Sequence, residues 1–142
     1  MCIGNRDGGD DAIGPYIADR LIEEKTDIKV IDCGTVPENY TSIVKRYSSK
    51  LLIIIDAVDM NLKPGEIRIV TKDKIGVMTI STHGIPVSVL INYLEQYVEN
   101  IIFIGIQPKI MSGEMTDIVK KKCDNLVNLL KEKKIEKITK LF

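Results

Sequence analysis

Two short runs of consecutive apolar residues constrain the fold more than any other feature of the sequence. The segments "LLIII" (51–55) and "IIFIGI" (101–106) carry no polar residue on either face, which is typical of strands buried inside a parallel sheet. Both runs are far too short to span a bilayer. Amphipathic stretches with helical spacing lie between them, so the sequence predicts an α/β fold in which helices cover both faces of a sheet.

The other elements follow from local patterns. Strands are predicted at "MCI" (1–3), "DIKVID" (27–32), 50–57 and 100–106, with "IRIV" (67–70) and "KIGVMTI" (74–80) as a hairpin or edge addition. Helices are predicted over 15–25, 37–47, 86–98 and 115–134. The expected fold class is therefore a three-layer α/β/α sandwich with a mainly parallel twisted sheet of about five strands. The length favours a single domain over residues 1–142.

Composition excludes several classes of partner. With 20 basic and 20 acidic residues the formal charge is zero, which argues against nucleic acid or an anionic membrane as the main partner. No basic-then-apolar leader opens the chain, so a cytoplasmic location is expected. The three cysteines (Cys2, Cys33 and Cys123) are an odd, widely spaced set, and reduced thiols are expected rather than a disulfide framework.

Acidic residues gather where the predicted strands end. Asp10 and Asp11 follow the first strand. Asp32 ends the second strand, and Asp56 ends the third. The only histidine, His83, lies in "STHGIP", a predicted loop before a helix. Because ligands of open α/β sheets bind beyond the carboxyl ends of the strands, these residues predict a cation site at that edge.

Each of these residues also has a structural interpretation. Asp10 or Asp11 could cap the helix that begins near Pro15. Asp32 could hold a turn by accepting hydrogen bonds from backbone amides. Asp56 is harder to explain structurally, because a carboxylate at the end of an apolar strand is costly to bury unless it is exposed in a cleft or has a partner.

Other chemistries find little support in the motifs. The loop "GNRDGGDDAIGP" (4–15) is rich in glycine but acidic, and it matches neither G-x-G-x-x-G nor a P-loop. The chain has no G-x-S-x-G elbow and no cysteine pairs with zinc-finger spacing. Cys33 and His83 could form a nucleophile–base pair, but a small thiol at a strand end is more often simply buried.

Five sequence blocks occur in an order known from one protein family. The blocks are "GNRDGGDDAIGP", "IDCGTVPEN", "LLIIIDAVDMNLKPGEIRI", "STHGIP" and "IIFIGIQP". On these blocks the chain resembles hydrogenase maturation proteases over about residues 3–119, and it is most similar to the branch that processes the large subunit of formate-hydrogenlyase-type [NiFe] hydrogenase.

The resemblance implies a cytoplasmic endopeptidase of the aspartic-type class. It implies that the enzyme cuts a C-terminal extension from the large-subunit precursor after nickel insertion. By motif match, Asp11, Asp56 and His83 contact the metal, and Asp11 and Asp56 are the catalytic candidates. We expect the nickel to be supplied by the precursor rather than bound tightly by the protease. The oligomeric state stays open, with a monomer as the expectation.

Two departures from the family pattern and two alternatives accompany this hypothesis. Ala12 replaces a usual glycine, which should be tolerated unless the position needs a positive φ. Only "MCI" precedes Gly4, whereas the family's first strand is longer, so that strand is either short or begins upstream.

The alternative functions are a non-proteolytic nickel-binding assembly factor and a protease with its own metal ion.

Overall fold

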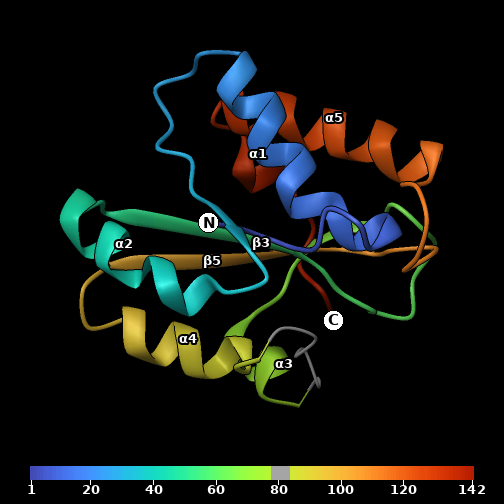
Figure 1. The fold of residues 1–142 in the computed structure, drawn as a ribbon. Coiled ribbons are helices and arrows are strands. Elements are labelled where there is room, and N and C mark those ends of the chain that lie inside the picture. Colours follow the sequence, from blue (N-terminus) through green and yellow to red (C-terminus); the bar gives the residue numbers. More distant parts are fainter. Residues whose placement is uncertain (78–83) are drawn as a thin grey trace.

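A five-stranded sheet lies between two layers of helices, as the sequence predicts (Figure 1). The structure is a computed structural model that describes residues 1–77 and 84–142. The strand order is β2-β1-β3-β5-β4, and every pairing is parallel except that of β4 with β5. The strands are β1 (Cys2–Ile3), β2 (Asp32–Gly34), β3 (Leu51–Ala57), β4 (Ile67–Ile69) and β5 (Asn100–Ile106).

The helices cover both faces of the sheet. Helices α1 and α5 lie on one face, and α2, α3 and α4 lie on the other (Figure 1). No helix in the described parts of the chain is long and apolar enough to cross a membrane. The helices are α1 (Ile13–Glu23), α2 (Thr41–Tyr47), α3 (Lys72–Val77), α4 (Val87–Leu94) and α5 (Asp117–Lys131), with short 3-10 turns η1 (Gly9–Ala12), η2 (Pro37–Tyr40) and η3 (Ile135–Lys137).

The apolar residues of the central strands divide between two cores. In β3, Leu52 and Ile54 pack into the core beneath α2 and α4, whereas Ile55 packs into the core beneath α1 and α5. This division follows from the alternation of side chains along a strand, since each apolar strand faces two helical layers. The unbroken apolar run that predicts β3 is therefore explained by burial on both faces.

The segment after β4 differs from the prediction. Residues 72–77 form helix α3 rather than part of a second hairpin strand, and residues 78–80 of the predicted strand lie outside the described residues. The physical reason is that the outer edge of β4 is already occupied by the C-terminal segment. Ile69 N–H donates to the carbonyl oxygen of Thr139 at 2.9 Å, and Leu141 N–H donates to that of Ile69 at 2.9 Å.

The second predicted strand also differs. Pairing with β1 begins at Asp32 and ends at Gly34, so 27–31 are not part of β2 although they were predicted to be. A strand requires a hydrogen-bonded neighbour, and β1 contributes only Cys2 and Ile3 to the sheet. The shortness of β1 therefore decides how much of this segment becomes strand.

Candidate functional site

The glycines of the N-terminal loop allow close backbone packing. A Cβ on Gly4 would lie 2.0 Å from the carbonyl oxygen of Asp11. Gly9 has φ +63°, and a Cβ there would lie 2.6 Å from both the backbone nitrogen and the carbonyl oxygen of Ser112. The loop between β1 and α1 is thus folded tightly on itself and against the loop that follows β5. Its glycines serve this packing.

Two of the predicted site residues, Asp11 and Asp56, are buried at the carboxyl edge of the sheet. Asp11 lies in η1 and is 6% exposed, and its Oδ2 accepts a hydrogen bond from the backbone N–H of Asn5 at 3.3 Å. Asp56 is 2% exposed near the end of β3, and its Oδ1 accepts from the backbone N–H of Ala57 at 2.8 Å. Since η1 contacts β3, two separate elements bring carboxylates to one place.

The third predicted residue, His83, lies outside the described residues. Among the residues that the structure does describe, no three His, Cys, Asp or Glu side chains form a group that could hold a metal ion. The described part of the site is therefore a pair of carboxylates. Oxygen ligands of this kind suit hard or borderline cations, and imidazole is the usual nitrogen ligand for nickel.

Asp10 is neither a cap of α1 nor an exposed ligand. It is fully buried, and α1 has no side-chain cap. Its Oδ2 accepts hydrogen bonds from the backbone N–H of Lys109 at 2.8 Å and of Ile110 at 3.0 Å. Thr116 donates its N–H to Oδ1 at 2.7 Å and its hydroxyl to Oδ2. Burial alone would raise the pKa of Asp10, but these hydrogen bonds outweigh it and hold the pKa below its usual value.

The bonds of Asp10 fix the position of its neighbour Asp11. They attach η1 to the loop between β5 and α5, about a hundred residues away along the chain. The backbone N–H of Asp10 strengthens the attachment by donating to the carbonyl of Ile110 at 2.7 Å. Asp10 is therefore a positioning residue, and the question that the sequence left open for it is answered by the structure.

Arg6 and Asp32 form a second anchor of the loop. The Arg6 guanidinium donates to both carboxylate oxygens of Asp19 on α1, at 2.8 and 2.9 Å, and to Asp32 Oδ2 at 2.6 Å. Asp32 Oδ1 also accepts from the backbone N–H of Gly34 at 3.3 Å, which is the turn role considered for it. Because Arg6 is 54% exposed, this ion-pair group contributes little stability and mainly orients the loop.

Gln107 was missed by the sequence analysis, and it organises the loop after Asp56. Its Oε1 accepts from the backbone N–H of Met60 at 2.7 Å and of Leu62 at 3.2 Å. Its Nε2 donates to Asp59 Oδ1 at 3.2 Å. The sequence did contain a signal, since a polar residue directly after the apolar run 101–106 is the same pattern that singled out Asp56.

Glu38 is a further acidic residue that sequence reasoning did not single out. Its Oε2 is buried and has no hydrogen-bond partner among the described residues. Its Oε1 lies 3.7 Å from the point that a Cβ on Gly84 would occupy. The carboxylate thus lies against the residue that follows His83 in the sequence. No spacing or strand-end rule marks this position, because Glu38 sits on the short turn η2.

Two expectations about neighbouring residues are confirmed. Ala12 has φ −79°, a value that any residue adopts, so its methyl group fits without strain. Cys33 is fully buried and free, and burial raises the pKa of its thiol to about 12. A buried thiol held neutral in this way is a poor nucleophile, which argues against a catalytic role for Cys33. Cys2 and Cys123 are also free and buried.

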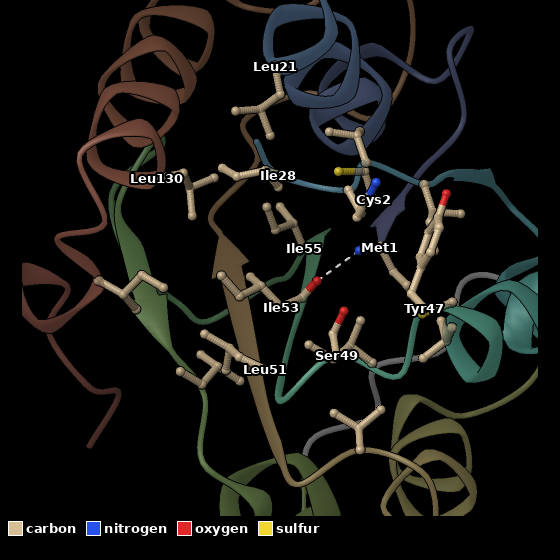
Figure 2. A pocket seen from close by; sticks show the side chains of 18 of the residues that line it. Met1, Cys2, Leu21, Ile28, Tyr47, Ser49, Leu51, Ile53, Ile55 and Leu130 are labelled. Atoms are coloured by element: carbon tan, nitrogen blue, oxygen red, sulfur yellow. Dashed lines mark hydrogen bonds between the residues drawn. The ribbon is translucent and has the colours of Figure 1, made fainter. Parts of the chain in front are cut away.

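A cavity of about 690 Å³ lies away from the carboxylate pair. It is at the amino-end side of β3, around Met1, Ile53 and Leu130 (Figure 2). A shallower hollow of about 520 Å³ lies beside the N-terminal loop and includes Arg6 and Tyr16. The position of Asp11 and Asp56 at the carboxyl edge of the sheet, rather than a cavity, therefore defines the candidate site.

Comparison with known proteins gives one consistent result. A family model described as hydrogenase maturation protease matches residues 15–133. The hydrogenase 3 maturation protease of Escherichia coli is 41% identical over 113 residues, which cover 78% of this chain and 72% of that protein.

Solved structures agree. The solution structure of the endopeptidase HycI from Escherichia coli matches with a TM-score of 0.91 and 34% identity, over 99% of this chain and 94% of that one. The crystal structure of a [NiFe] hydrogenase maturation protease HycI from Thermococcus kodakarensis matches with a TM-score of 0.83 and 30% identity, over 92% of this chain and 87% of that one.

Together with these matches, the α/β fold and its acidic edge place the chain in a class of hydrolases, the endopeptidases. Within that class, the chain belongs to the hydrogenase maturation protease family. The resemblance drawn from the five sequence blocks is thus confirmed.

Proposed function

We propose that this chain is the cytoplasmic endopeptidase that removes the C-terminal extension of a [NiFe]-hydrogenase large-subunit precursor after nickel insertion. Asp11, Asp56 and His83 contact the nickel, which the precursor carries. The observation that supports this proposal best is the pair of buried carboxylates, Asp11 and Asp56, presented by two different elements at the carboxyl edge of the sheet. Membership of the protease family supports the reaction.

The anchoring of the loop supports a role in recognition. Asp10 and Arg6 attach the segment around Asp11 to three other parts of the fold, namely α1, β2 and the loop before α5. A carboxylate held in this way is pre-organised for a metal that arrives with the substrate. Contact with the nickel would distinguish a nickel-loaded precursor from an unloaded one. It would also place the scissile bond beside the carboxylates.

The site offers two ways to assist hydrolysis. A carboxylate at this position can act as general base toward the attacking water. A nickel ion held by the precursor can polarise the scissile carbonyl as a Lewis acid. Both mechanisms require the chain to hold Asp11 and Asp56 in the correct place.

The recognition model predicts that cleavage depends on nickel in the precursor. Purified protein is incubated with nickel-loaded and nickel-free precursor, and the released C-terminal peptide is quantified by mass spectrometry. We expect the loaded precursor to be cleaved at least about a hundredfold faster, because the unloaded form lacks the group that positions the bond. Equal cleavage of the two forms would contradict recognition of nickel while leaving the protease activity in place.

The same assay separates the two alternatives. An assembly factor would bind the loaded precursor and lose that binding in Asp56→Asn and His83→Ala, but would release no peptide in any form. A protease with its own metal would contain stoichiometric metal after purification. Metal analysis of the isolated protein by mass spectrometry therefore accompanies the cleavage measurement.

A further inference from the structure

Helix α4 carries apolar side chains toward solvent as well as toward the core. Its solvent side carries Val89, which is 52% exposed, and Tyr93, which is 38% exposed. Tyr97, which is 46% exposed, follows in the turn after the helix. These three residues, the α4 stripe, are spaced four positions apart and therefore lie in one row. The core side of the helix is formed by Val87, Leu90, Ile91 and Leu94.

A lysine from the neighbouring helix orders the aromatic part of the α4 stripe. The ring centroids of Tyr93 and Tyr97 lie 5.5 Å apart. Helix α2 lies on the same face of the sheet as α4 (Figure 1), and Lys45 is in its last turn. The Nζ of Lys45 lies 4.9 Å from the centroid of Tyr93 and 4.5 Å from that of Tyr97. A cation held over two rings fixes their orientation, so less entropy is lost when a partner binds them.

The surface beside the α4 stripe is positively charged. Lys45 and Arg46 are adjacent at the end of α2, and neither forms an ion pair with another residue that the structure describes. Glu95, at the end of α4, is already paired with Lys72 at 2.9 Å. The exposed Glu99 beyond the stripe offsets only one of the two positive charges. Rows of aromatic and apolar side chains beside basic groups are typical of protein interfaces, and here the charge complements an acidic partner.

The α4 stripe is continuous with the edge of the sheet that carries Asp11 and Asp56. Helix α4 leads into the start of β5, which runs parallel to β3. The first turn of α4 therefore lies toward the carboxyl ends of the strands, and Tyr97 lies toward their amino ends. A stable complex between two proteins buries about 800 Å² on each partner, far more than two carboxylates provide. A protein substrate that reaches these carboxylates therefore needs a further contact surface.

We propose that the α4 stripe, together with Lys45 and Arg46, docks an acidic and partly apolar surface of the hydrogenase large-subunit precursor. The identity of this partner rests on the proposed function. A second copy of this chain fits less well, because a two-fold contact would place the positive groups of both copies in one interface. Docking on α4 holds the precursor while its nickel-bearing end lies at the neighbouring edge of the sheet.

The test measures steady-state cleavage of nickel-loaded precursor by four variants of the full chain. Lys45→Glu reverses a charge on the docking surface, and Lys121→Glu makes the same change on the exposed side of α5. Tyr97→Ser removes an aromatic ring from the stripe, and Ile118→Ser removes a similarly exposed side chain from α5. We expect KM to rise at least about tenfold in Lys45→Glu and Tyr97→Ser, with kcat within about twofold of the parent. Both α5 variants should keep KM within about twofold.

The salt dependence gives a second measurement of the same contact. Added salt should lower kcat/KM of the parent protein more than that of Lys45→Glu, because salt screens attraction between charges. If the parent cleaves the precursor and KM of Lys45→Glu and Tyr97→Ser matches that of the α5 variants, the docking surface is wrong while the proposed function stands.

Further outcomes separate the docking surface from the proposed function. If the parent cleaves no precursor, the proposed function fails. Calorimetric binding of the precursor to the same variants then decides on the surface, and equal affinities or no binding would overturn it. If sedimentation shows a dimer that Tyr97→Ser dissociates, the stripe is an interface between copies, which also overturns the proposal. Binding of a single-stranded oligonucleotide that is lost in Lys45→Glu, with precursor binding unchanged, would do the same.

Discussion

Replacing Asp56 with asparagine is expected to reduce cleavage of a nickel-loaded precursor by at least about a hundredfold while the protein stays folded. Asparagine keeps the shape of the side chain and can still accept the hydrogen bond from Ala57 N–H at Oδ1. It removes the negative charge that a cation contact or a general base requires, and losses of about 10²–10⁴ are typical of such groups. Single-turnover cleavage with circular dichroism of the same sample measures both properties.

The matched control is Asp59→Asn, three positions further along the chain. Asp59 is exposed and bonds to the backbone N–H of Asn61 and to Gln107, so its role is to shape the loop. We expect this variant to retain at least about half of the cleavage rate. Full activity in Asp56→Asn, or an equal loss in Asp59→Asn, would show that the carboxylate of Asp56 has no special place in the reaction.

Replacing Asp10 with alanine is expected to lower the free energy of unfolding far more than replacing the exposed Asp7 of the same loop. The carboxylate is fully buried and accepts hydrogen bonds from Lys109, Ile110 and Thr116. Its removal leaves several partly buried donors without their acceptor, which costs about 3–5 kcal/mol of the free energy of unfolding. Equilibrium urea denaturation followed by circular dichroism measures the loss.

Asp7→Ala provides the comparison within the same loop. Asp7 is exposed, and we expect its replacement to change the free energy of unfolding by less than about 0.5 kcal/mol. Asp10→Ala should also slow cleavage, because the loop that positions Asp11 loses its attachment. A stability equal to that of the parent protein would mean that the hydrogen bonds of Asp10 do not hold η1 in place.

Lowering the pH should remove the stabilisation that the Asp10 carboxylate provides. The pKa of Asp10 in the folded protein lies below its usual value, so the unfolded chain binds the proton first as the pH falls. The stabilisation from this group is therefore complete above about pH 4. It is lost as the pH falls through the lowered pKa of the folded state. Denaturation at pH 3 and pH 7 should show a smaller difference between Asp10→Ala and the parent protein at the lower pH.

Much of the fold could be predicted because the clearest patterns in the sequence are unbroken apolar runs, which indicate strands buried on both faces of a sheet. The run 51–55 and the run 101–106 lie in β3 and β5, which pair with each other in register over seven residues. The predictions failed where a partner strand decided the outcome. Residues 27–31 are not strand because β1 is short, and 72–77 are helix because the C-terminal segment occupies the edge of β4.

The locations of two candidate residues could be predicted to a similar degree, whereas His83 lies outside the described residues. Asp11 and Asp56 lie at the expected edge because the carboxyl ends of parallel strands and the loops that follow them meet there. Glu38 and the partners of Gln107 could not be predicted, because their contacts are made by segments far apart in the sequence. Distances between such segments depend on how the layers pack.

The sequence by itself determined the α/β class, the buried central strands, the protease family and the acidic edge, since each of these depends on local composition or ordered motifs. Only the tertiary structure decided that Asp10 and Asp11 have different hydrogen-bond partners. The two residues are adjacent and chemically identical, but Asp10 meets donors about a hundred residues away at Lys109, Ile110 and Thr116. The Oδ2 of Asp11 accepts a hydrogen bond within its own loop, from the backbone N–H of Asn5. The donors that hold Asp10 are brought together only by folding, so no local sequence pattern could assign it this anchoring role.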